Sequence, residues 1–426
     1  GMCAAARLTA MGMKVIVVEK SPYPGGRCSH RVREDCLVTT GALMIPMGPD
    51  SAIRQAFDAV GAEMDMVDIT GRMRYRLNHG DYDLPPGGGG LYGMIEFAMG
   101  DETAARALFG RIRDALFNWM PLDTISIRDW LDQYTDNVEV KNLFQGYCAA
   151  LMGTNLHEIP AGEFFRFLKY SSKGSRFGLA RRGNGALMES LSAALARQGS
   201  EVRCQSGCKS ILVERGRVKG VVITDSRGAE QRIEAELVLS NTGPDRTVEL
   251  AGGAQQFERS YLVRLRKDAA EAPIFHVSFV LDRPLIEDFE GCLVFGNNRN
   301  LIYLEIPSAI SPGTISPEGK YLHTAYGAPA DAAEADLTRE LANTLTELEK
   351  NFPGVTSEAQ FLVKAKHSGA FPGMRRWAGY GMPVDTPIAG LYNVGDGCAP
   401  PGTIGTESAA ASARVAVDMI AGRSLS

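Results

Sequence analysis

The chain of 426 residues contains no apolar run of about eighteen residues, the length at which a membrane-spanning helix becomes recognisable. It also lacks a basic start followed by an apolar core and a cleavage site, so no secretory signal is evident. Basic residues do not cluster, and the formal net charge is −5. Because phosphate binding needs clustered positive charge, a nucleic-acid partner is not expected.

Cysteine and histidine are sparse, with eight and six residues respectively. The cysteines form no CxxC pair and the histidines no HxxxH pair, so the sequence predicts neither a disulfide framework nor a metal site. We expect a cytoplasmic protein. Peripheral contact with a membrane stays open, because it requires only a modest apolar patch. The oligomeric state has no signature in the sequence.

The remaining composition, 45% hydrophobic and 22% charged, is ordinary for a soluble globular protein. A chain of this length exceeds one compact core, and two kinds of segment alternate along it. We therefore predict two interleaved domains. One is assembled from residues 1–62, 181–250 and 372–426, and the other from residues 63–180 and 251–371.

The first domain has the rhythm of an α/β unit. A helix at 4–11 precedes a short apolar run at 14–19 (KVIVVE), which is typical of a buried parallel strand. An amphipathic helix at 187–198 precedes a strand meander at 201–235 and a buried strand at 235–240. The chain ends with a strand at 391–394 and a small-residue helix at 404–421.

The second domain mixes helices with antiparallel strands. A hairpin is predicted at 72–84, then a break at Pro85–Gly90 and a mainly helical stretch at 91–170. Alternating residues from 260 to 322 indicate an antiparallel sheet, and an amphipathic helix is predicted at 331–352. The predicted class is therefore α/β with an interleaved α+β domain.

The first forty residues suggest a dinucleotide-binding unit. In such a unit the amides of a glycine-rich turn hold the pyrophosphate, and an acidic residue ending the second strand holds a ribose. Here Gly1 opens the helix and Glu19 ends the strand, at about the expected twenty-residue spacing. Taken alone this match is weak, because any helix–strand pair with a terminal glutamate resembles it.

The next residues make the pattern more specific. Glu19-Lys20, a short spacer and Gly25-Gly26-Arg27 resemble the extended fingerprint of the phytoene desaturase–amine oxidase group of FAD enzymes. The resemblance implies that Gly25 and Gly26 let the backbone approach FAD and that Arg27 faces its phosphates or ribityl chain. Gly41 falls where this group runs its backbone past the flavin ring.

Two later segments resemble the same group. Residues 182–187 (RGNGAL) with the following meander are similar to its second FAD-contacting segment, which implies a main-chain contact from Cys208 to adenine and an approach of Asn241 to the pyrophosphate. Residues 391–397 (LYNVGDG) resemble its C-terminal motif. There Gly395 and Asp396 would meet the ribityl chain, and the helix opening at Ile404 would point its partial positive charge at the flavin pyrimidine.

The resemblance spans nearly the whole chain and is nearest to phytoene desaturase-like proteins. It implies an FAD-binding Rossmann-like domain of three ββα layers, a small apolar substrate, and hydride transfer between flavin N5 and a C–C bond. No catalytic side chain is assigned. Met44, Trp377 and Tyr380 are candidates for the substrate side, although packing explains each of them better. Thr40 and Met44 depart from the acidic residue and histidine usual in the desaturases, so carotenoid specificity is not implied.

Two alternatives share this scaffold. One is a flavin amine or protoporphyrinogen-type oxidase, and the other is a flavin-free carrier of a prenyl or lipid group, against which Glu19, Arg27 and Asp396 argue. The alignment with the fingerprint further predicts that the first central strand and the first glycines precede Gly1. On that expectation the chain as given binds FAD weakly or not at all.

Overall fold

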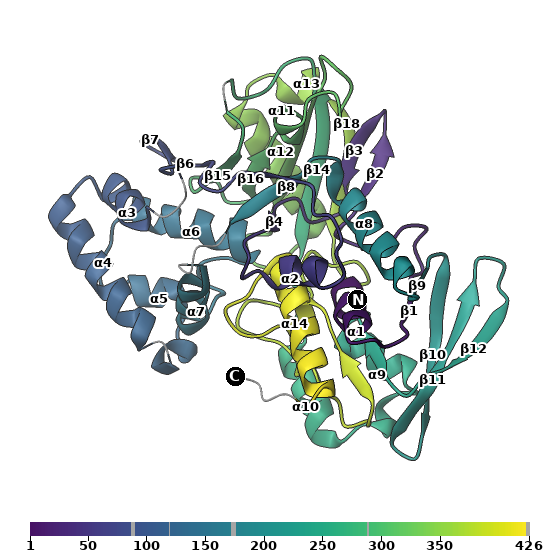
Figure 1. Cartoon of the computed structure of the whole chain (residues 1–426). Helices are drawn as coiled ribbons and strands as arrows, with labels where there is room; N and C mark the ends of the chain where they lie inside the picture. The colour runs from purple at the N-terminus through teal and green to yellow at the C-terminus, as the bar shows by residue number, and fades with distance from the viewer. Residues whose placement is uncertain (87–89, 119, 172–175, 288, 423–426) are drawn as a thin grey trace.

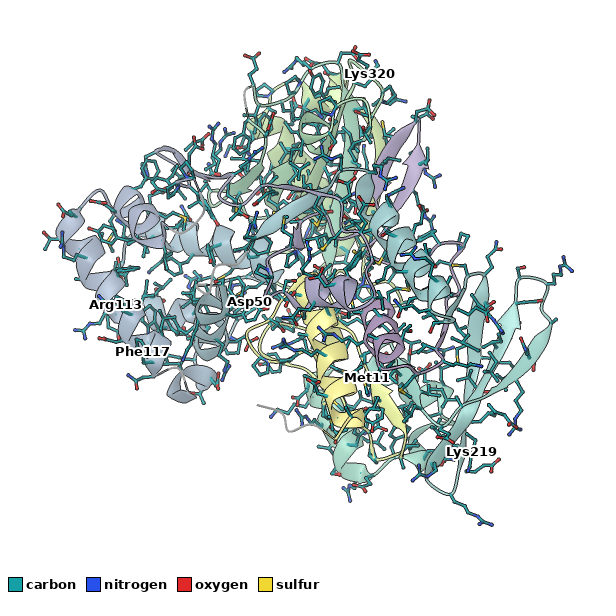
Figure 2. All side chains as sticks on the ribbon, viewed as in Figure 1. Met11, Asp50, Arg113, Phe117, Lys219 and Lys320 are labelled. Carbon is teal, nitrogen blue, oxygen red and sulfur yellow. The ribbon has the colours of Figure 1, made fainter. Side chains whose placement is uncertain are left out.

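The computed structural model describes residues 1–86, 90–118, 120–171, 176–287 and 289–422. Within them, Figure 1 shows three regions: a helical lobe, a large sheet with its own helices, and a third region that holds both chain ends. Charged side chains such as Arg113, Lys219 and Lys320 project from the outer surfaces of these regions (Figure 2). No helix in the described part of the chain is long and apolar enough to cross a membrane.

The region with the chain ends contains two parallel strand pairs. β1 (Ile16–Val18) pairs with β9 (Glu201–Arg203), and β13 (Val238–Ser240) pairs with β19 (Leu391–Asn393). The two pairs form separate sheets within the described residues. β1 was predicted to be buried, but Ile16 is 41% exposed, because β1 has a hydrogen-bonded partner strand on only one of its edges.

Small residues let three helices of this region pack closely. α14, drawn in yellow in Figure 1, lies against α1 and α2 from the start of the chain. Ala5 and Ala6 of α1 share a core cluster with Ala410 and Ala411 of α14. The helices of the region are α1 (Met2–Ala10), α2 (Ala52–Ala59), α8 (Gly183–Arg197), α9 (Pro244–Leu250), α10 (Arg259–Asp268) and α14 (Gly405–Ile420). Its antiparallel meander is β10 (Ser206–Glu214), β11 (Arg217–Asp225) and β12 (Glu230–Glu234).

The large sheet has seven strands in the order β18-β14-β17-β16-β15-β6-β7. Apolar residues on one of its faces pack against α12, and the other face is covered in part by α6. The strands are β6 (Met73–Leu77), β7 (Gly80–Asp83), β14 (Ile274–Leu281), β15 (Cys292–Phe295), β16 (Leu301–Glu305), β17 (Tyr321–Gly327) and β18 (Gln360–His367). Its helices are α11 (Pro307–Ile310), α12 (Leu337–Asn351) and α13 (Val355–Glu358).

The helical lobe was predicted as one mainly helical stretch, and its described residues form five α-helices. They are α3 (Leu91–Met99), α4 (Glu102–Phe117), α5 (Ile127–Leu131), α6 (Val138–Met152) and α7 (Ala161–Ser171). Two small antiparallel sheets connect the regions. They comprise β2 (His30–Arg33) with β3 (Cys36–Thr39), and β4 (Ile45–Pro46) and β5 (Met66–Asp68) on either side of β8 (Phe177–Ala180).

Three predicted elements differ from the structure. Residues 259–268 form helix α10 instead of a strand, and Tyr261 of this helix packs in the same core as Leu391. β9 leaves the predicted meander to pair with β1. α12 begins at Leu337, because Asp336 caps it by accepting hydrogen bonds from the amides of Thr338 and Arg339. The middle of the predicted break at Pro85–Gly90 lies outside the described residues. The domain boundaries stay predictions.

Candidate functional site

An ion pair between distant segments marks the centre of the site. Arg27 Nη2 lies 2.7 Å from Asp396 Oδ1, although 369 positions separate the two residues. The amide of Arg375 donates to the other carboxylate oxygen at 2.8 Å, and Arg27 Nη1 donates to the carbonyl of Gly373. Burial alone would raise the pKa of Asp396, but the charge and hydrogen bond of Arg27 hold it below the ordinary value. Asp396 is therefore a buried, ionised acceptor.

The glycines around Arg27 allow its backbone to pack closely. A Cβ at Gly41 would lie 2.9 Å from the carbonyl oxygen of Arg27. At Gly25, where φ is +96°, a Cβ would lie 2.3 Å from Cγ of Met188 and 2.6 Å from the carbonyl oxygen of Cys28. Gly26 also has a positive φ, +57°, but a Cβ there would meet nothing within 4 Å. An added side chain would therefore clash with its neighbours at Gly25 but not at Gly26.

This contrast predicts unequal effects of alanine. Gly25→Ala should lower the free energy of unfolding by more than about 2 kcal/mol, since it adds a backbone clash to an unfavourable φ. Gly26→Ala, the matched control, should cost about 1–2 kcal/mol, the ordinary penalty of a left-handed residue. Urea denaturation of both variants measures the difference. Equal losses would contradict the assigned packing at Gly25.

A second contact joins the first helix to the C-terminal motif. The side-chain amide of Asn241 lies between the Gly1 nitrogen, at 3.3 Å, and the carbonyl oxygen of Val394, at 2.8 Å. A Cβ at Gly395 would lie 2.3 Å from the Asn241 amide, and φ at Gly395 is +114°. The Gly395 amide donates to Ser412 Oγ at 2.8 Å. The segments predicted to hold the pyrophosphate and the ribityl chain therefore meet.

The remaining predicted cofactor residues lie around these contacts. The Glu19 carboxylate accepts from the amide of Ser21 at 2.7 Å, and a Cβ at Gly207 would lie 3.9 Å from Cβ of Lys20. The half-buried thiol of Cys208 donates to the carbonyl of Ser210. Ile404 is the residue before the first turn of α14. The contacts of these residues with FAD stay predictions.

The three substrate-side candidates have different environments. Met44 packs against the core of the helical lobe. Trp377 is half-buried and donates from Nε1 to the carbonyl of Glu158, while Tyr380 is 39% exposed. The structure thus gives Trp377 a packing role and places Tyr380 at the surface.

Arg376, next to Trp377, is buried. Its Nη2 lies 2.6 Å from Oε1 of Glu163, with side-chain exposures of 6% and 2%. Its other nitrogens donate to the carbonyls of Tyr380 and Pro400. The Glu163 carboxylate also accepts from the amide of Gly402. This ion pair holds the segment that leads into α14.

A row of stacked rings crosses the large sheet beside the ion pair of Arg27. His367, His276, Tyr326 and Tyr303 come from β18, β14, β17 and β16, with neighbouring ring centroids 5.7, 5.4 and 4.6 Å apart. The Tyr326 hydroxyl donates to the carbonyl of Gly41. Burial lowers the pKa of His276 to about 3 and, together with the charge of Arg27, lowers the pKa of His367. This ring row is uncharged at neutral pH.

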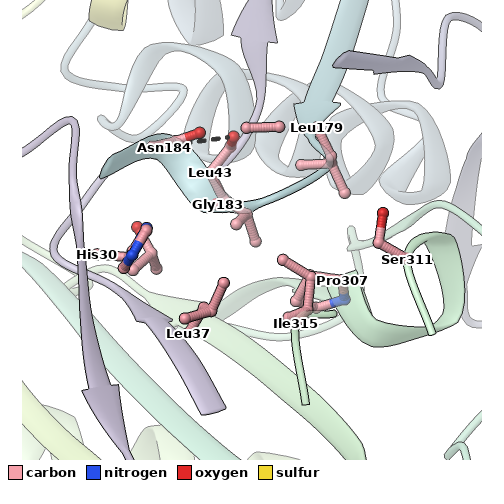
Figure 3. Close-up of a pocket in the computed structure, with 11 residues that line it drawn as sticks. His30, Leu37, Leu43, Leu179, Gly183, Asn184, Pro307, Ser311 and Ile315 are labelled. Carbon is pink, nitrogen blue, oxygen red and sulfur yellow. Dashed lines mark hydrogen bonds between the residues drawn. The ribbon is translucent and has the colours of Figure 1, made fainter. Parts of the chain in front are cut away.

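A small cavity lies beside the segment around Gly41 (Figure 3). Leu37, Leu43 and Ile315 contribute apolar surface, and His30 and Asn184 contribute polar atoms. Its volume of about 20 Å³ suffices for roughly one water molecule. Asn184 donates to the carbonyl of Ala42 at 2.7 Å, so the RGNGAL segment positions the residues next to Gly41. The described residues contain no group of three or more metal-ligating side chains.

The ring row and Arg376–Glu163 were missed from the sequence. Histidines and tyrosines spread over four strands show no local spacing, and the ion pair joins residues 213 positions apart. Glu305, a buried carboxylate at the end of the apolar strand β16, was also missed. Here the sequence does contain a signal, a lone charged residue on one face of an apolar strand.

The fold combines parallel strand pairs, a separate meander and an interleaved sheet that faces the Arg27–Asp396 site. This combination defines an FAD-binding oxidoreductase fold of the amine oxidase type. The chain belongs to the family described as flavin containing amine oxidoreductase, whose model matches residues 1–421. This membership confirms the resemblance and the predicted fold class, and it makes the protein an oxidoreductase by family.

Individual relatives are distant. Prolycopene isomerase of Arabidopsis thaliana is 24% identical, over 94% of this chain and 78% of the relative. An oxidoreductase from Methanosarcina mazei has a similar structure, with a TM-score of 0.86 at 21% identity over 98% and 97% of the two chains. Putrescine oxidase bound to putrescine has a TM-score of 0.69 at 17% identity over 99% and 96%. Such identities establish a shared fold only.

Proposed function

We propose that the protein is an FAD-dependent oxidoreductase that moves hydride between flavin N5 and a C–C bond of an apolar, isoprenoid-like substrate. The observation that carries this proposal is the convergence of Arg27, Asp396 and Gly41 beside the uncharged ring row. Bound FAD would supply the N5 position that accepts or returns hydride. The chain's own residues would hold the ribityl chain and keep water from the substrate face.

The available groups fit FAD. Asp396 is a buried carboxylate that can accept from a ribityl hydroxyl, and Arg27 brings a positive charge next to it. Gly41 passes Arg27 so closely that a Cβ would not fit, which leaves backbone alone at the position predicted to face the ring. The buried rings of Tyr326 and His276 offer flat surface without charge, which suits a conjugated apolar chain.

Amine oxidation is the second candidate. The nearly parallel rings of Tyr303 and Tyr326, with centroids 4.6 Å apart, favour it, because tyrosine faces attract a cation. Mixing the FAD-loaded protein anaerobically with a polyene that retains saturated C–C bonds to be oxidised, or with a primary amine, distinguishes the two. Loss of the yellow flavin absorption with the polyene alone is the expected result, and loss with the amine alone would replace the proposal by its alternative.

Asp396 provides the test of cofactor binding. Asp396→Ala should weaken FAD binding by about 10- to 150-fold, the value of one charge-assisted hydrogen bond. Titration of FAD into wild type and variant measures this ratio, with Asp282→Ala, a change at an exposed carboxylate, as the control. An unchanged affinity in Asp396→Ala would contradict the role of this residue.

A further inference from the structure

The far end of the ring row carries two buried polar groups without well-formed hydrogen bonds among the described residues. Glu305, the last residue of β16, is fully buried, and among the described residues its carboxyl oxygens have no well-formed hydrogen bond, with only the weak donor Cys292 beside them. The hydroxyl of Tyr75 on β6 is also fully buried and has no partner there. Nearly all buried polar groups in folded proteins are hydrogen-bonded, so two neighbouring exceptions require an explanation.

Strand pairing puts these groups on the face of the sheet that holds the ring row. Cys292 and Glu305 are direct cross-strand partners, as are Val294 and Tyr303 two residues along, and Tyr75 pairs with Val294. Side chains two residues apart on a strand share a face. The thiol of Cys292 lies next to the Glu305 carboxyl, and helix α6 covers this part of the face with Cys148.

The cluster therefore lies behind the tyrosine pair as seen from the cofactor segment. Tyr326 contacts the carbonyl of Gly41, Tyr303 stacks on Tyr326, and Glu305 follows Tyr303 on the same strand. The side chains next to the two polar groups are the thiols of Cys292 and Cys148 and the ring of Tyr147. A substrate that reaches from the Gly41 segment past these rings would place its far end at Glu305, after a rotation of the tyrosine side chains.

The carboxyl is suited to a neutral ligand group. Burial raises the pKa of Glu305 to about 8, so at neutral pH the group is protonated, with one donor and one acceptor. The Tyr75 hydroxyl likewise donates and accepts. A hydroxyl complements both without moving a proton, whereas an ammonium would be complemented only after Glu305 loses its proton, which would bury two charges.

We propose that Glu305 and Tyr75 form a binding subsite for the hydroxyl end group of an otherwise apolar substrate. The subsite specifies the substrate class of the proposed function. It rests on that function only because the function places the reacting bond near Gly41. It is a specificity site, because Glu305 contacts the end of the substrate remote from the cofactor segment.

Three probes of equal length test the subsite: decanol, decylamine and decane. Calorimetric titration into the full chain should show that decanol binds more tightly than decane, and Glu305→Met should weaken decanol binding about tenfold. Glu305→Gln, which still donates and accepts, should retain decanol binding within a few-fold. Glu340→Gln, at a buried carboxylate that accepts from Asn300, is the matched control and should leave the ratios unchanged.

Two outcomes would overturn the proposal. Tighter binding of decylamine, lost in Glu305→Gln, would identify an ammonium site and support amine oxidation. Equal binding of decanol and decane in wild type and in Glu305→Met would remove the cluster from the substrate site. A protein whose bound flavin is not reduced by the polyene, but which still distinguishes decanol from decane, would refute the proposed function and keep the subsite.

Thermal stability gives a second measurement that needs no ligand. If Glu305 is kept for binding, Glu305→Met removes an unpaired buried group and should raise the melting temperature by roughly 2–4 °C. A melting temperature several degrees below wild type would mean that the carboxyl stabilises the fold, and would contradict the subsite.

Discussion

Glu163→Gln is expected to lower the free energy of unfolding by about 3–5 kcal/mol, because it leaves the charge of Arg376 buried without its counterion. Both partners are almost fully buried, and the Glu163 oxygens also accept from the amide of Gly402 and from Arg166. The glutamine side chain can replace one acceptor but not the negative charge. Chemical denaturation of wild type and variant measures the loss.

A double variant tests this explanation. Glu163→Met with Arg376→Met removes both charges and should recover much of the stability, since an apolar pair can replace a buried ion pair at little cost. Glu358→Gln, which breaks the half-exposed pair with Arg283, is the control and should cost less than about 1 kcal/mol. If Glu163→Gln costs no more than this control, the buried pair does not stabilise the fold.

Glu163→Gln should also weaken cofactor binding. Arg376 donates to the carbonyls of Pro400 and Thr403, which directly precede the start of α14. When Glu163 no longer holds the guanidinium, the first amides of α14 lose their fixed position. FAD affinity should therefore fall in Glu163→Gln at temperatures where the protein remains folded.

The predictions for the cofactor side of the site came from local motifs. Gly25, Gly26 and Arg27 are adjacent, and backbone geometry explains both glycines. Asp396 lies in a turn between a short apolar strand and a small-residue helix, each of which has its own sequence period. The ion pair between Arg27 and Asp396 was not predicted, because no local pattern relates residues 369 positions apart.

Long-range packing made the substrate side unpredictable. The side chains of the ring row are adjacent only because β14 pairs with both β17 and β18, and β17 with β16. The apolar residues of α10 are too few to show a clear period, so the segment was wrongly predicted as a strand. The packing of Tyr261 against Phe257 fixes the position of this helix. Tertiary contacts override weak local preference in both cases.

Glu305 should also make stability depend on pH. The folded state keeps its proton up to a pKa of about 8, whereas the unfolded chain releases it near the ordinary value of 4.5. The unfolded state therefore binds fewer protons between these two values, and stability falls as pH rises through this window, by about 1.4 kcal/mol per pH unit. Below the window both states are protonated, and above it both are ionised, so the dependence levels off at each end.

The comparison with Glu305→Gln isolates this effect, because glutamine does not titrate and all other groups cancel. Cys292, Tyr303 and Tyr326 face the carboxyl, and burial raises their pKa values well above their ordinary values, so none changes charge in the window. His276, stacked on Tyr326, stays neutral. Between about pH 5 and pH 8, wild type should lose about 3–4 kcal/mol relative to Glu305→Gln in urea denaturation. Parallel pH profiles would mean that Glu305 is ionised in the folded protein, and the neutral hydroxyl subsite would then be wrong.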